Sequence, residues 1–204
     1  MQNLKTIYPK LILKAFLFAV VLSGCSKEKN IDVNAPAYKI AESEKLIIPA
    51  AIDLPANLPN GNTRIATFFA EGVQKYKAQI KAGSNPVTYE WVFVAPEANL
   101  YDASNAKVGT HSAGPTWQLS VMDSIYGQQF NPSKFAPSTD PASIDWLQLM
   151  PKTGKVPTCV FTNVSYIQRI ATVGGKAPSV LPSGLSETAE VKYTAIYRFT
   201  QKNP

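Results

Sequence analysis

The sequence predicts a single, mainly β domain, either an antiparallel β-sandwich or an open β-barrel, behind an N-terminal export signal. Its apolar residues come in short or alternating stretches that Pro, Gly, Asn and Ser interrupt, as is typical of antiparallel sheets. We find no internal repeat and no long amphipathic helix. With 204 residues, of which 45% are hydrophobic, the chain has enough apolar material for one core.

The first 24 residues have the layout of a signal peptide. Three Lys precede an apolar stretch over residues 15–22, which is too short to cross a bilayer. Residues 22–25, Leu-Ser-Gly-Cys, resemble the lipobox of bacterial lipoproteins. In such proteins the cysteine sulfur receives a diacylglycerol, the signal is cleaved before it, and the new amine is acylated. We therefore expect lipidated Cys25 to anchor the protein to a membrane of the cell envelope.

The residues after this cysteine indicate where the protein resides and where its domain begins. Ser26 stands where some bacteria have an Asp that retains lipoproteins in the inner membrane, which favours the outer membrane, on its periplasmic or surface face. Residues 25–44 are polar, mix charges and show no hydrophobic period, so we expect a flexible tether. The β domain then spans residues 45–204.

Charge and cysteine content argue against nucleic-acid binding and against a disulfide-stabilised domain. The first 24 residues hold three of the 20 Lys and Arg and no acidic residue, which leaves 17 basic against 14 acidic residues in the mature chain. This small excess includes no basic run, so we expect no nucleic-acid partner. Once Cys25 carries lipid, Cys159 is the only cysteine left and no intrachain disulfide forms.

The first half of the domain contains a strand pattern and a hairpin pattern. Residues 91–94 are apolar on both faces and predict a central strand that ends at Ala95-Pro96, because proline cannot donate to the ladder. Residues 99–102 and 107–110 flank a Ser-Asn turn and predict a hairpin.

The second half begins with a loop pattern and ends with the clearest strand. Residues 120–141 are rich in Pro, Ser, Gln and Asn and predict a long loop. Residues 145–149 fit either a strand or a helical turn, and we favour the strand. Residues 164–170 predict another strand. The alternation over residues 191–199 predicts a strand with one apolar face, formed by Val191, Tyr193, Ala195, Tyr197 and Phe199.

A set of short motifs follows in a fixed order between about Ile52 and Phe199. They are residues 72–76 (GVQKY), 91–102 (WVFVAPEANLYD), 109–117 (GTHSAGPTW), 146–149 (WLQL), 166–169 (YIQR) and 173–178 (VGGKAP). Together these motifs resemble the family called domain of unknown function 3455. Most members are secreted bacterial or fungal proteins, so the resemblance implies an all-β extracytoplasmic domain. It implies no activity.

The chain lacks two cysteines that members of this family often carry. One would stand at Ala78, and the other would follow Pro178, where residues 179–185 contain no cysteine. The disulfide that the resemblance implies between them is therefore absent. Its loss removes an expected source of rigidity from the loop after Pro178.

His111 is the single histidine and lies in a Gly- and Pro-containing turn over residues 109–115. Glycines there let the backbone approach a ligand closely. As a structural residue, His111 would bond the loop backbone through its ring nitrogens. As a catalytic base it would need a nucleophile and an orienting carboxylate. The nearby candidates for these roles are Thr110, Ser112 or Thr116, and Glu97 or Asp102.

We expect no metal and no cofactor. One histidine and no pair of free cysteines exclude the usual zinc sites. A site for another divalent ion at Glu97, Asp102 and His111 is left open as an alternative. The sequence Gly174-Gly175-Lys176 lacks the spacing of a phosphate-binding loop and predicts a turn.

Aromatic side chains next to polar ones offer a second kind of site. Trp117, together with Tyr166, Gln168 and Arg169, would form a shelf on which a sugar ring stacks. Aromatic residues at alternate strand positions are otherwise expected to fill the core. Glu97 would also suit one member of a glycosidase carboxylate pair, although a solvated loop acid is the simpler interpretation.

These observations predict a lipid-anchored extracytoplasmic domain that binds a glycan, a small ligand or a protein. Its functional surface would be the turn over residues 109–117 and the loop over residues 173–178. One alternative is an extracellular hydrolase or lyase that uses His111 with a nearby carboxylate, and another is a structural envelope protein. A concave pocket with His111 beside a carboxylate would favour the enzyme, and a shallow aromatic groove would favour binding. The sequence leaves the oligomeric state open.

Overall fold

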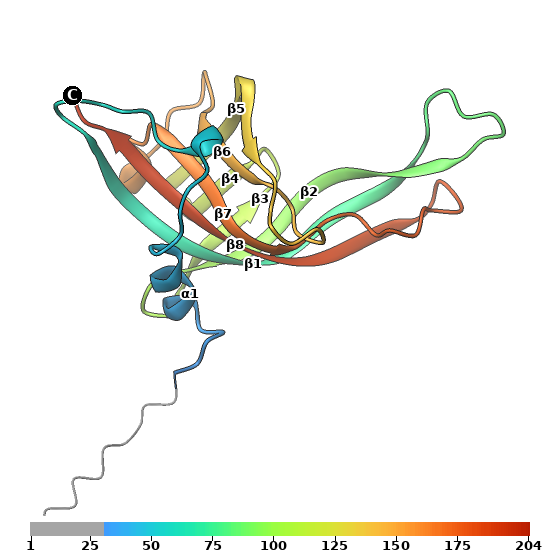
Figure 1. Ribbon diagram of the computed structural model, residues 1–204, viewed down its shortest axis with the longest axis horizontal. Coiled ribbons are helices and arrows are strands. Elements are labelled where there is room, and N and C mark those ends of the chain that lie inside the picture. The colour runs from blue at the N-terminus through green and yellow to red at the C-terminus, as the bar shows by residue number, and fades with distance from the viewer. Residues whose placement is uncertain (1–30) are drawn as a thin grey trace, which may run out of the picture. The chain divides into compact units, whose positions relative to one another are not determined.

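The computed structural model of the protein describes residues 31–204 (Figure 1). The predicted signal peptide over residues 1–24, the lipidation site Cys25 and the first residues of the predicted tether lie outside the described residues. Within the described part, no helix combines the length and the apolar character that crossing a membrane requires.

Eight antiparallel strands form one sheet that closes on itself. Each strand pairs with the next along the chain, and β8 pairs back with β1 to complete the ring. The strands are β1 (Asn62–Ile80), β2 (Tyr89–Tyr101), β3 (Lys107–Ser112), β4 (Thr116–Ser120), β5 (Asp123–Ala136), β6 (Trp146–Pro151), β7 (Tyr166–Gly174) and β8 (Thr188–Lys202). The helical elements are α1 (Pro36–Ser43) and the 3-10 turns η1 (Ala50–Ile52) and η2 (Cys159–Phe161).

This topology confirms the predicted mainly antiparallel β fold. Of the two arrangements that the sequence allows, a sandwich or an open barrel, the barrel is the closer description, and its sheet is closed. The predicted hairpin over residues 99–110 joins β2 to β3, and residues 145–149 fall mainly in a strand, β6. The last two predicted strands fall in β7 and β8.

Two sequence predictions about strand limits are wrong. β2 does not end at Ala95-Pro96 but continues to Tyr101. Pro96 lies where β2 pairs with β1 alone, since β2 pairs with β3 only from Ala98 onward, and prolines within sheets are found on such edge strands. Residues 120–141, predicted to be a long loop, contain β5. Pro132 of that strand falls where its pairing with β6 is interrupted.

The inner face of the ring holds a core of apolar and aromatic side chains. The apolar face predicted for β8 lies there from Tyr193 to Phe199. Large side chains from other strands and from η2 complete this core: Phe68, Leu100, Trp117, Ile125, Leu149, Phe161 and Ile167. Phe199 packs against both Trp117 and Phe161, with ring centroids 5.6 and 4.8 Å apart. This core leaves one end of the ring unfilled, as described below.

Part of the outer face is covered by the N-terminal segment. Ile40 of α1 and Ile52 of η1 pack in an outer cluster with Phe69, Ile170 and Ile196. Helix α1 lies within residues 25–44, for which the sequence predicts a flexible tether. Its apolar packing therefore extends the folded part of the chain to the N-terminal side of residue 45.

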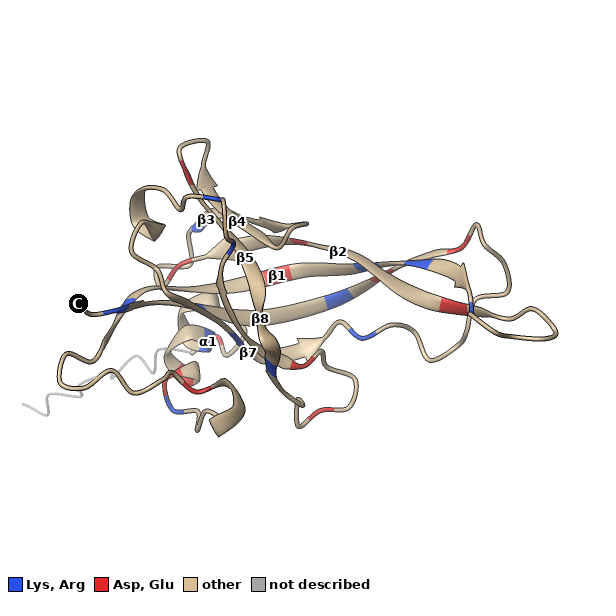
Figure 2. Cartoon of the chain, turned by 90° about the horizontal axis from the view of Figure 1, so that it is seen from above, with Lys and Arg blue, Asp and Glu red and all other residues tan. Residues whose placement is uncertain are grey.

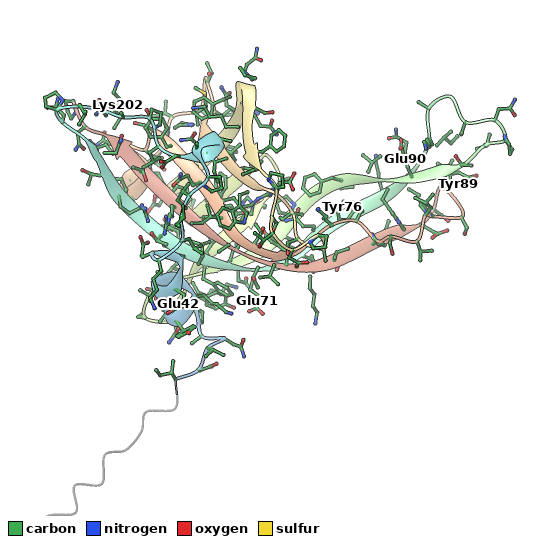
Figure 3. All side chains as sticks on the ribbon, in the orientation of Figure 1. Glu42, Glu71, Tyr76, Tyr89, Glu90 and Lys202 are labelled. Atoms are coloured by element: carbon green, nitrogen blue, oxygen red, sulfur yellow. The ribbon has the colours of Figure 1, made fainter. Side chains whose placement is uncertain are left out.

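β1, β2 and β8 continue beyond the other strands as an arm (Figure 1). We use this name for β1 from Gln74 to Ile80 with its partners in β2 and β8. Charged residues lie along the strands of the arm (Figure 2). On one of its faces Lys75 pairs with Glu97 and Glu190. The other face is aromatic, and Figure 3 shows Tyr76 and Tyr89 along it.

The segment between β7 and β8 is tied to this arm. The Trp91 indole nitrogen donates to the Val180 carbonyl at 2.8 Å, and the Tyr76 hydroxyl donates to the Gly175 carbonyl at 2.6 Å. These bonds hold the loop after Pro178, which lacks the disulfide that the family resemblance implies. The arm leaves the ring at the end where the candidate site lies.

Candidate ligand-binding site

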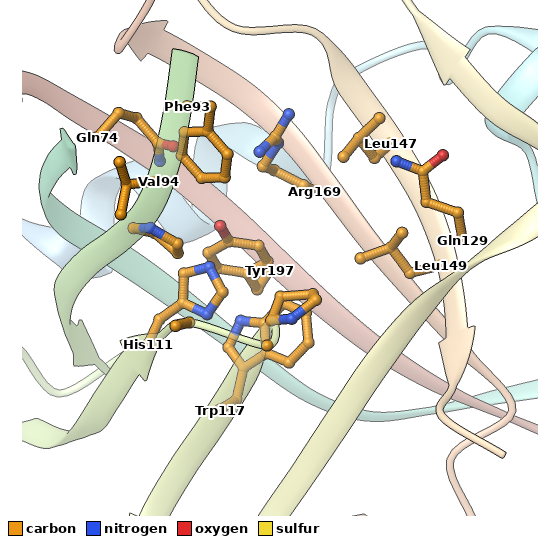
Figure 4. A pocket seen from close by; sticks show the side chains of 14 residues that line it. Gln74, Phe93, Val94, His111, Trp117, Gln129, Leu147, Leu149, Arg169 and Tyr197 are labelled. Carbon is orange, nitrogen blue, oxygen red and sulfur yellow. The ribbon is translucent and has the colours of Figure 1, made fainter. Parts of the chain in front are cut away.

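A cavity of about 340 Å³ occupies the end of the ring from which the arm departs (Figure 4). Every strand contributes at least one side chain to its lining, as does the turn between β3 and β4. The labelled residues are Gln74, Phe93, Val94, His111, Trp117, Gln129, Leu147, Leu149, Arg169 and Tyr197. Because no single segment forms this cavity, it exists only once the ring has closed.

The aromatic part of the lining is a packed group of three rings. His111 in β3 and Trp117 in β4 are register partners, and their rings stack with centroids 4.6 Å apart and planes inclined by 13°. Tyr197 of β8 meets them from across the ring, 4.8 Å from His111 and 5.1 Å from Trp117. All three residues are buried, which gives this part of the cavity a rigid aromatic surface.

His111 is held in one protonation state. Its Nδ1 lies 2.9 Å from the Thr116 carbonyl oxygen, which can only accept, so Nδ1 carries the proton and Nε2 is an acceptor. Burial lowers the pKa of His111 to about 4; the Thr116 carbonyl offsets part of this shift, and the positive charge of Arg169 adds to it. The imidazole is therefore neutral at physiological pH.

Arg169 brings a positive charge to the cavity. Its Nε and one Nη donate to the Asp145 carbonyl oxygen at 3.1 and 2.7 Å. None of the ion pairs found within residues 31–204 involves Arg169. The side chain is half-buried, so its charge is only partly screened by water.

Among residues 31–204, several buried polar atoms at or next to the cavity form no hydrogen bond. They are Gln74 Nε2, Trp117 Nε1 and the hydroxyls of Tyr193 and Tyr197. Burial raises the pKa values of Tyr193 and Tyr197. For Tyr197 the Arg169 charge and contacts with the Tyr193 hydroxyl and the Arg169 guanidinium offset part of this rise, as does the Gln74 amide for Tyr193, but none of these contacts has the geometry of a hydrogen bond. Both hydroxyls therefore stay protonated and able to donate. Unpartnered buried donors are costly in a folded protein, so their clustering here calls for an explanation.

The structure brings together three of the residues that the sequence singles out, His111, Trp117 and Arg169. Within the described part of the chain, it brings no carboxylate to them. Glu97 lies on the outward face of β2, is 68% exposed and pairs with Lys75. Asp102 lies in the turn between β2 and β3, at the opposite end of β3 from Ser112, and accepts hydrogen bonds from the Ser104 and Ala106 backbones at 2.8 and 3.0 Å. These bonds, with that of the Ser104 hydroxyl, hold the pKa of Asp102 below its usual range.

The candidate nucleophiles are not aligned with His111 either. Thr110 and Ser112 neighbour it in β3, so their side chains point to the opposite face, where they are exposed. The hydroxyl of Thr116 donates to the Ala113 carbonyl at 2.9 Å. Within residues 31–204, no group of three or more His, Cys, Asp or Glu side chains is placed to hold a metal ion.

The predicted sugar-binding shelf does not form as one surface. Trp117 is fully buried, and Arg169 faces the interior of the ring. Gln168 faces the outside, where its Nε2 donates to the Ile52 carbonyl at 2.7 Å beneath η1. Tyr166 lies at the start of β7, far along the strand from the cavity. The alternation of side chains along β7 separates these residues onto two faces.

The sequence does not identify Gln74, Gln129, Leu147 and Leu149 as site residues, and it assigns Tyr197 to the core. The alternation of β8 places Tyr197 on the inward face, and the GVQKY motif contains Gln74. Neither signal shows that the two strands pair with each other, because β1 and β8 lie at opposite ends of the domain sequence.

A family model described as "Protein of unknown function (DUF3455)" matches residues 59–201. This match covers all eight strands of the ring apart from the last residue of β8. No curated protein and no solved structure matches the chain. The family resemblance drawn from the motifs is thereby confirmed.

Proposed function

The chain belongs to the DUF3455 family of proteins of unknown function, and from this premise we propose that it is an envelope-anchored protein that binds a small organic molecule in the mouth of its ring. The observation that carries the proposal is the cavity of about 340 Å³, closed in by all eight strands and equipped with unpartnered polar atoms. Small-molecule sites are typically concave, mostly apolar and fitted with a few orienting polar groups.

The shape of the site favours a small ligand over a glycan or a protein. A surface glycan would need an exposed aromatic shelf, whereas Trp117 is buried below the mouth. A protein partner would need a broad surface, and the donors that lack partners lie inside the ring instead. Gln74, His111, Trp117 and Tyr197 all line the cavity, although their polar atoms are buried, so a bound molecule would lie next to these donors and to the His111–Trp117 stack.

Binding also has more support than catalysis by His111. A general base in a hydrolase needs a nucleophile within hydrogen-bond reach and a group that orients the imidazole. Here a backbone carbonyl orients the ring, and the neighbouring Ser and Thr hydroxyls are turned away or already bonded. What His111 offers to a ligand is a flat stacking surface and the acceptor Nε2.

The proposal of an envelope anchor rests on the first residues of the sequence. The basic, apolar and Leu-Ser-Gly-Cys segments are those of a lipoprotein signal, with Cys25 as the lipidated residue. Several acyl chains on one residue hold a protein stably at a membrane. Ser26 favours the outer membrane, so the ring would face an extracytoplasmic compartment and sample small molecules there.

A ligand that binds only the folded state raises its thermal stability by mass action. We would measure the unfolding temperature of the full-length protein in detergent against benzyl and octyl carboxylates, amides, alcohols and amines. Val94 lines the mouth and is 51% exposed, so we would block the cavity with the variant Val94→Trp. The matched control is Val92→Trp in the same strand, whose register partner Lys77 lies on the charged face of the arm.

The proposal expects at least one compound to raise the unfolding temperature of the wild type and of Val92→Trp but not of Val94→Trp. If no compound does so, or if Val94→Trp responds as the wild type does, the mouth of the ring is not a small-molecule site.

A further inference from the structure

The cavity has a charge of one sign only. Of the residues that line it, Arg169 alone carries a formal charge, since His111 is neutral. No Asp or Glu lines the cavity, and no ion pair within residues 31–204 compensates Arg169. A partly buried cation without a counter-ion is unfavourable unless something else supplies negative charge.

The polar atoms around Arg169 also favour a negative ligand. Gln74 is 2% exposed, and its unpartnered Nε2 can only donate; the same holds for Trp117 Nε1. The Tyr197 hydroxyl stays protonated and lies close enough to Arg169 for that charge to lower its pKa in part. A guanidinium that lines the same cavity as these donors is suited to an acceptor that brings several lone pairs, as a carboxylate does.

The remaining walls are suited to the rest of such a molecule. Phe93 and Val94 lie on one side of the mouth and Leu147 and Leu149 on the other, with the His111–Trp117 stack between them (Figure 4). These groups offer apolar contact and a flat aromatic surface. They contain no second charge that would hold another ionic group.

We infer that the cavity takes a small organic monoanion, whose carboxylate pairs with Arg169 and whose apolar, preferably planar, body lies against the His111–Trp117 stack. This inference rests on the proposed small-molecule function and names the class of the ligand. Gln74 and Tyr197 would donate to the carboxylate oxygens, which would satisfy their unpartnered atoms. The free protein would keep these costly groups because the ligand uses them.

The test compares acids with amides of the same shape on the full-length protein in detergent. Calorimetry would give the affinities of benzoate and benzamide, 2-naphthoate and 2-naphthamide, and octanoate and octanamide, with acetate as the anion without a body. Hydrogen bonds to charged groups are markedly stronger than neutral ones, so we expect an acid to bind about 10-fold or more tightly than its amide in at least one pair. Acetate should bind far more weakly than that acid.

Variants of Arg169 then locate the preference. Arg169→Gln should lower the affinity for the acid about 10-fold or more and leave the affinity for the amide nearly unchanged. Arg169→Lys keeps the charge without the planar fork and should give an intermediate loss. Lys77→Gln removes one charge from the outward face of the arm, where Lys77 is exposed, and should change neither affinity.

Each outcome decides the inference. A preference for acids that Arg169→Gln removes and Lys77→Gln retains would support it. Acids and amides that bind equally well would overturn the inference while leaving the small-molecule function standing. An acid preference that survives in Arg169→Gln would also overturn it, because the charge would then be recognised elsewhere. Failure of every acid and every amide to bind would overturn both the inference and the small-molecule function. The comparison of acids with amides is made on the wild-type protein, so it does not depend on whether a variant folds.

Discussion

His111 is the residue at which the sequence allows the widest range of interpretations and the structure gives a specific geometry. His111 is 3% exposed and its ring stacks on Trp117. Its Nδ1–H donates a hydrogen bond to the Thr116 carbonyl. His111 can therefore both fix the turn and contact a ligand, because Nδ1 bonds the backbone while Nε2 is left as an acceptor. A base oriented by a carboxylate is not what this geometry provides.

The lowered pKa of His111 predicts that acid destabilises the domain. The unfolded chain takes up a proton near the ordinary value of 6.5, whereas the folded chain resists protonation down to about pH 4. Between pH 4 and 6.5 the unfolded state thus binds more protons than the folded state. The contribution of neutral His111 to the free energy of unfolding is therefore complete above pH 6.5 and is lost as the pH falls toward 4. The loss amounts to up to about 3 kcal/mol, at 1.36 kcal/mol per unit of pKa.

Urea unfolding of the wild type and of His111→Gln at several pH values tests this prediction. Gln does not titrate and its amide can donate to Thr116, so the free energy of unfolding of the variant should fall less between pH 6.5 and 4 than that of the wild type. Parallel pH dependences in the two proteins would contradict it.

Tyr197 predicts a separation of stability from binding. Its buried hydroxyl forms no hydrogen bond within residues 31–204, so Tyr197→Phe should leave the free energy of unfolding unchanged or raise it by about 1 kcal/mol. The same variant should weaken binding of the preferred acid, because one donor to the carboxylate is lost. Tyr76→Phe is the matched control: its hydroxyl donates to the Gly175 carbonyl, so its removal should lower stability by about 1 kcal/mol. Denaturant midpoints and calorimetry would measure both quantities, and a clear loss of stability in Tyr197→Phe would count against the prediction.

Helix α1 is an element that local sequence does not reveal as part of the domain. It has eight residues, and no side chain of its own caps it, so little in the segment itself predicts a stable helix. Its position is fixed by tertiary contacts on the outer face of the ring. Arg198 of β8 donates to the Ser43 carbonyl at 2.7 Å and pairs with Glu44 at 3.2 Å, while Ile40 enters the outer cluster.

Two isoleucines of the same segment test whether α1 contributes to the stability of the domain. Ile40 is 8% exposed and Ile47 is 92% exposed. Ile40→Ala should therefore lower the free energy of unfolding by about 2–4 kcal/mol, as expected for truncation of a buried aliphatic side chain. Ile47→Ala should change it by less than about 0.5 kcal/mol. Equal effects in urea unfolding would mean that this segment behaves as the flexible tether that its composition predicts.

Among the strands, those with strong alternation or a clear turn are the ones that the sequence predicts. In β8 apolar residues stand at every second position from Val191 to Phe199, and the hairpin of β2 and β3 contains Asp102 and Asn105 at its turn, where Asn105 adopts a positive φ of 67°. β5 is missed because Pro132 and its polar neighbours look like a loop. These residues are polar because β5 is partly exposed there and its pairing with β6 is interrupted. Such an interruption depends on the whole sheet and is not predicted by local composition.

Ring closure is what makes the site, and it lies beyond the sequence patterns. His111 and Trp117 are close in sequence, and a hairpin brings them together. Gln74, Arg169 and Tyr197 reach the same cavity only because β8 pairs with both β7 and β1. Composition and periodicity indicate which face of each strand is apolar, but the order in which strands pair is decided by the packing of the complete sheet. The fold class was therefore predictable, whereas the cavity was not.

The two cysteines predict how the whole protein is distributed in a cell. If Cys25 carries the lipid, Cys25→Ala should abolish incorporation of labelled palmitate and move the protein from the membrane fraction to the soluble one, because the acyl chains that hold it at the membrane are then missing. Cys159→Ala is the matched control. Cys159 is an exposed cysteine of the domain, so the protein with this replacement should keep both the label and its membrane association.

The same pair of variants separates anchoring from binding. Cys159 is not among the residues that line the cavity, and Cys25 precedes all of them in the sequence, so neither replacement removes one of the proposed ligand contacts. Cys25→Ala should therefore bind the preferred acid with wild-type affinity when purified. Palmitate label that persists in Cys25→Ala, or that disappears in Cys159→Ala, would contradict the lipobox assignment, and the ring would then need another means of reaching the envelope.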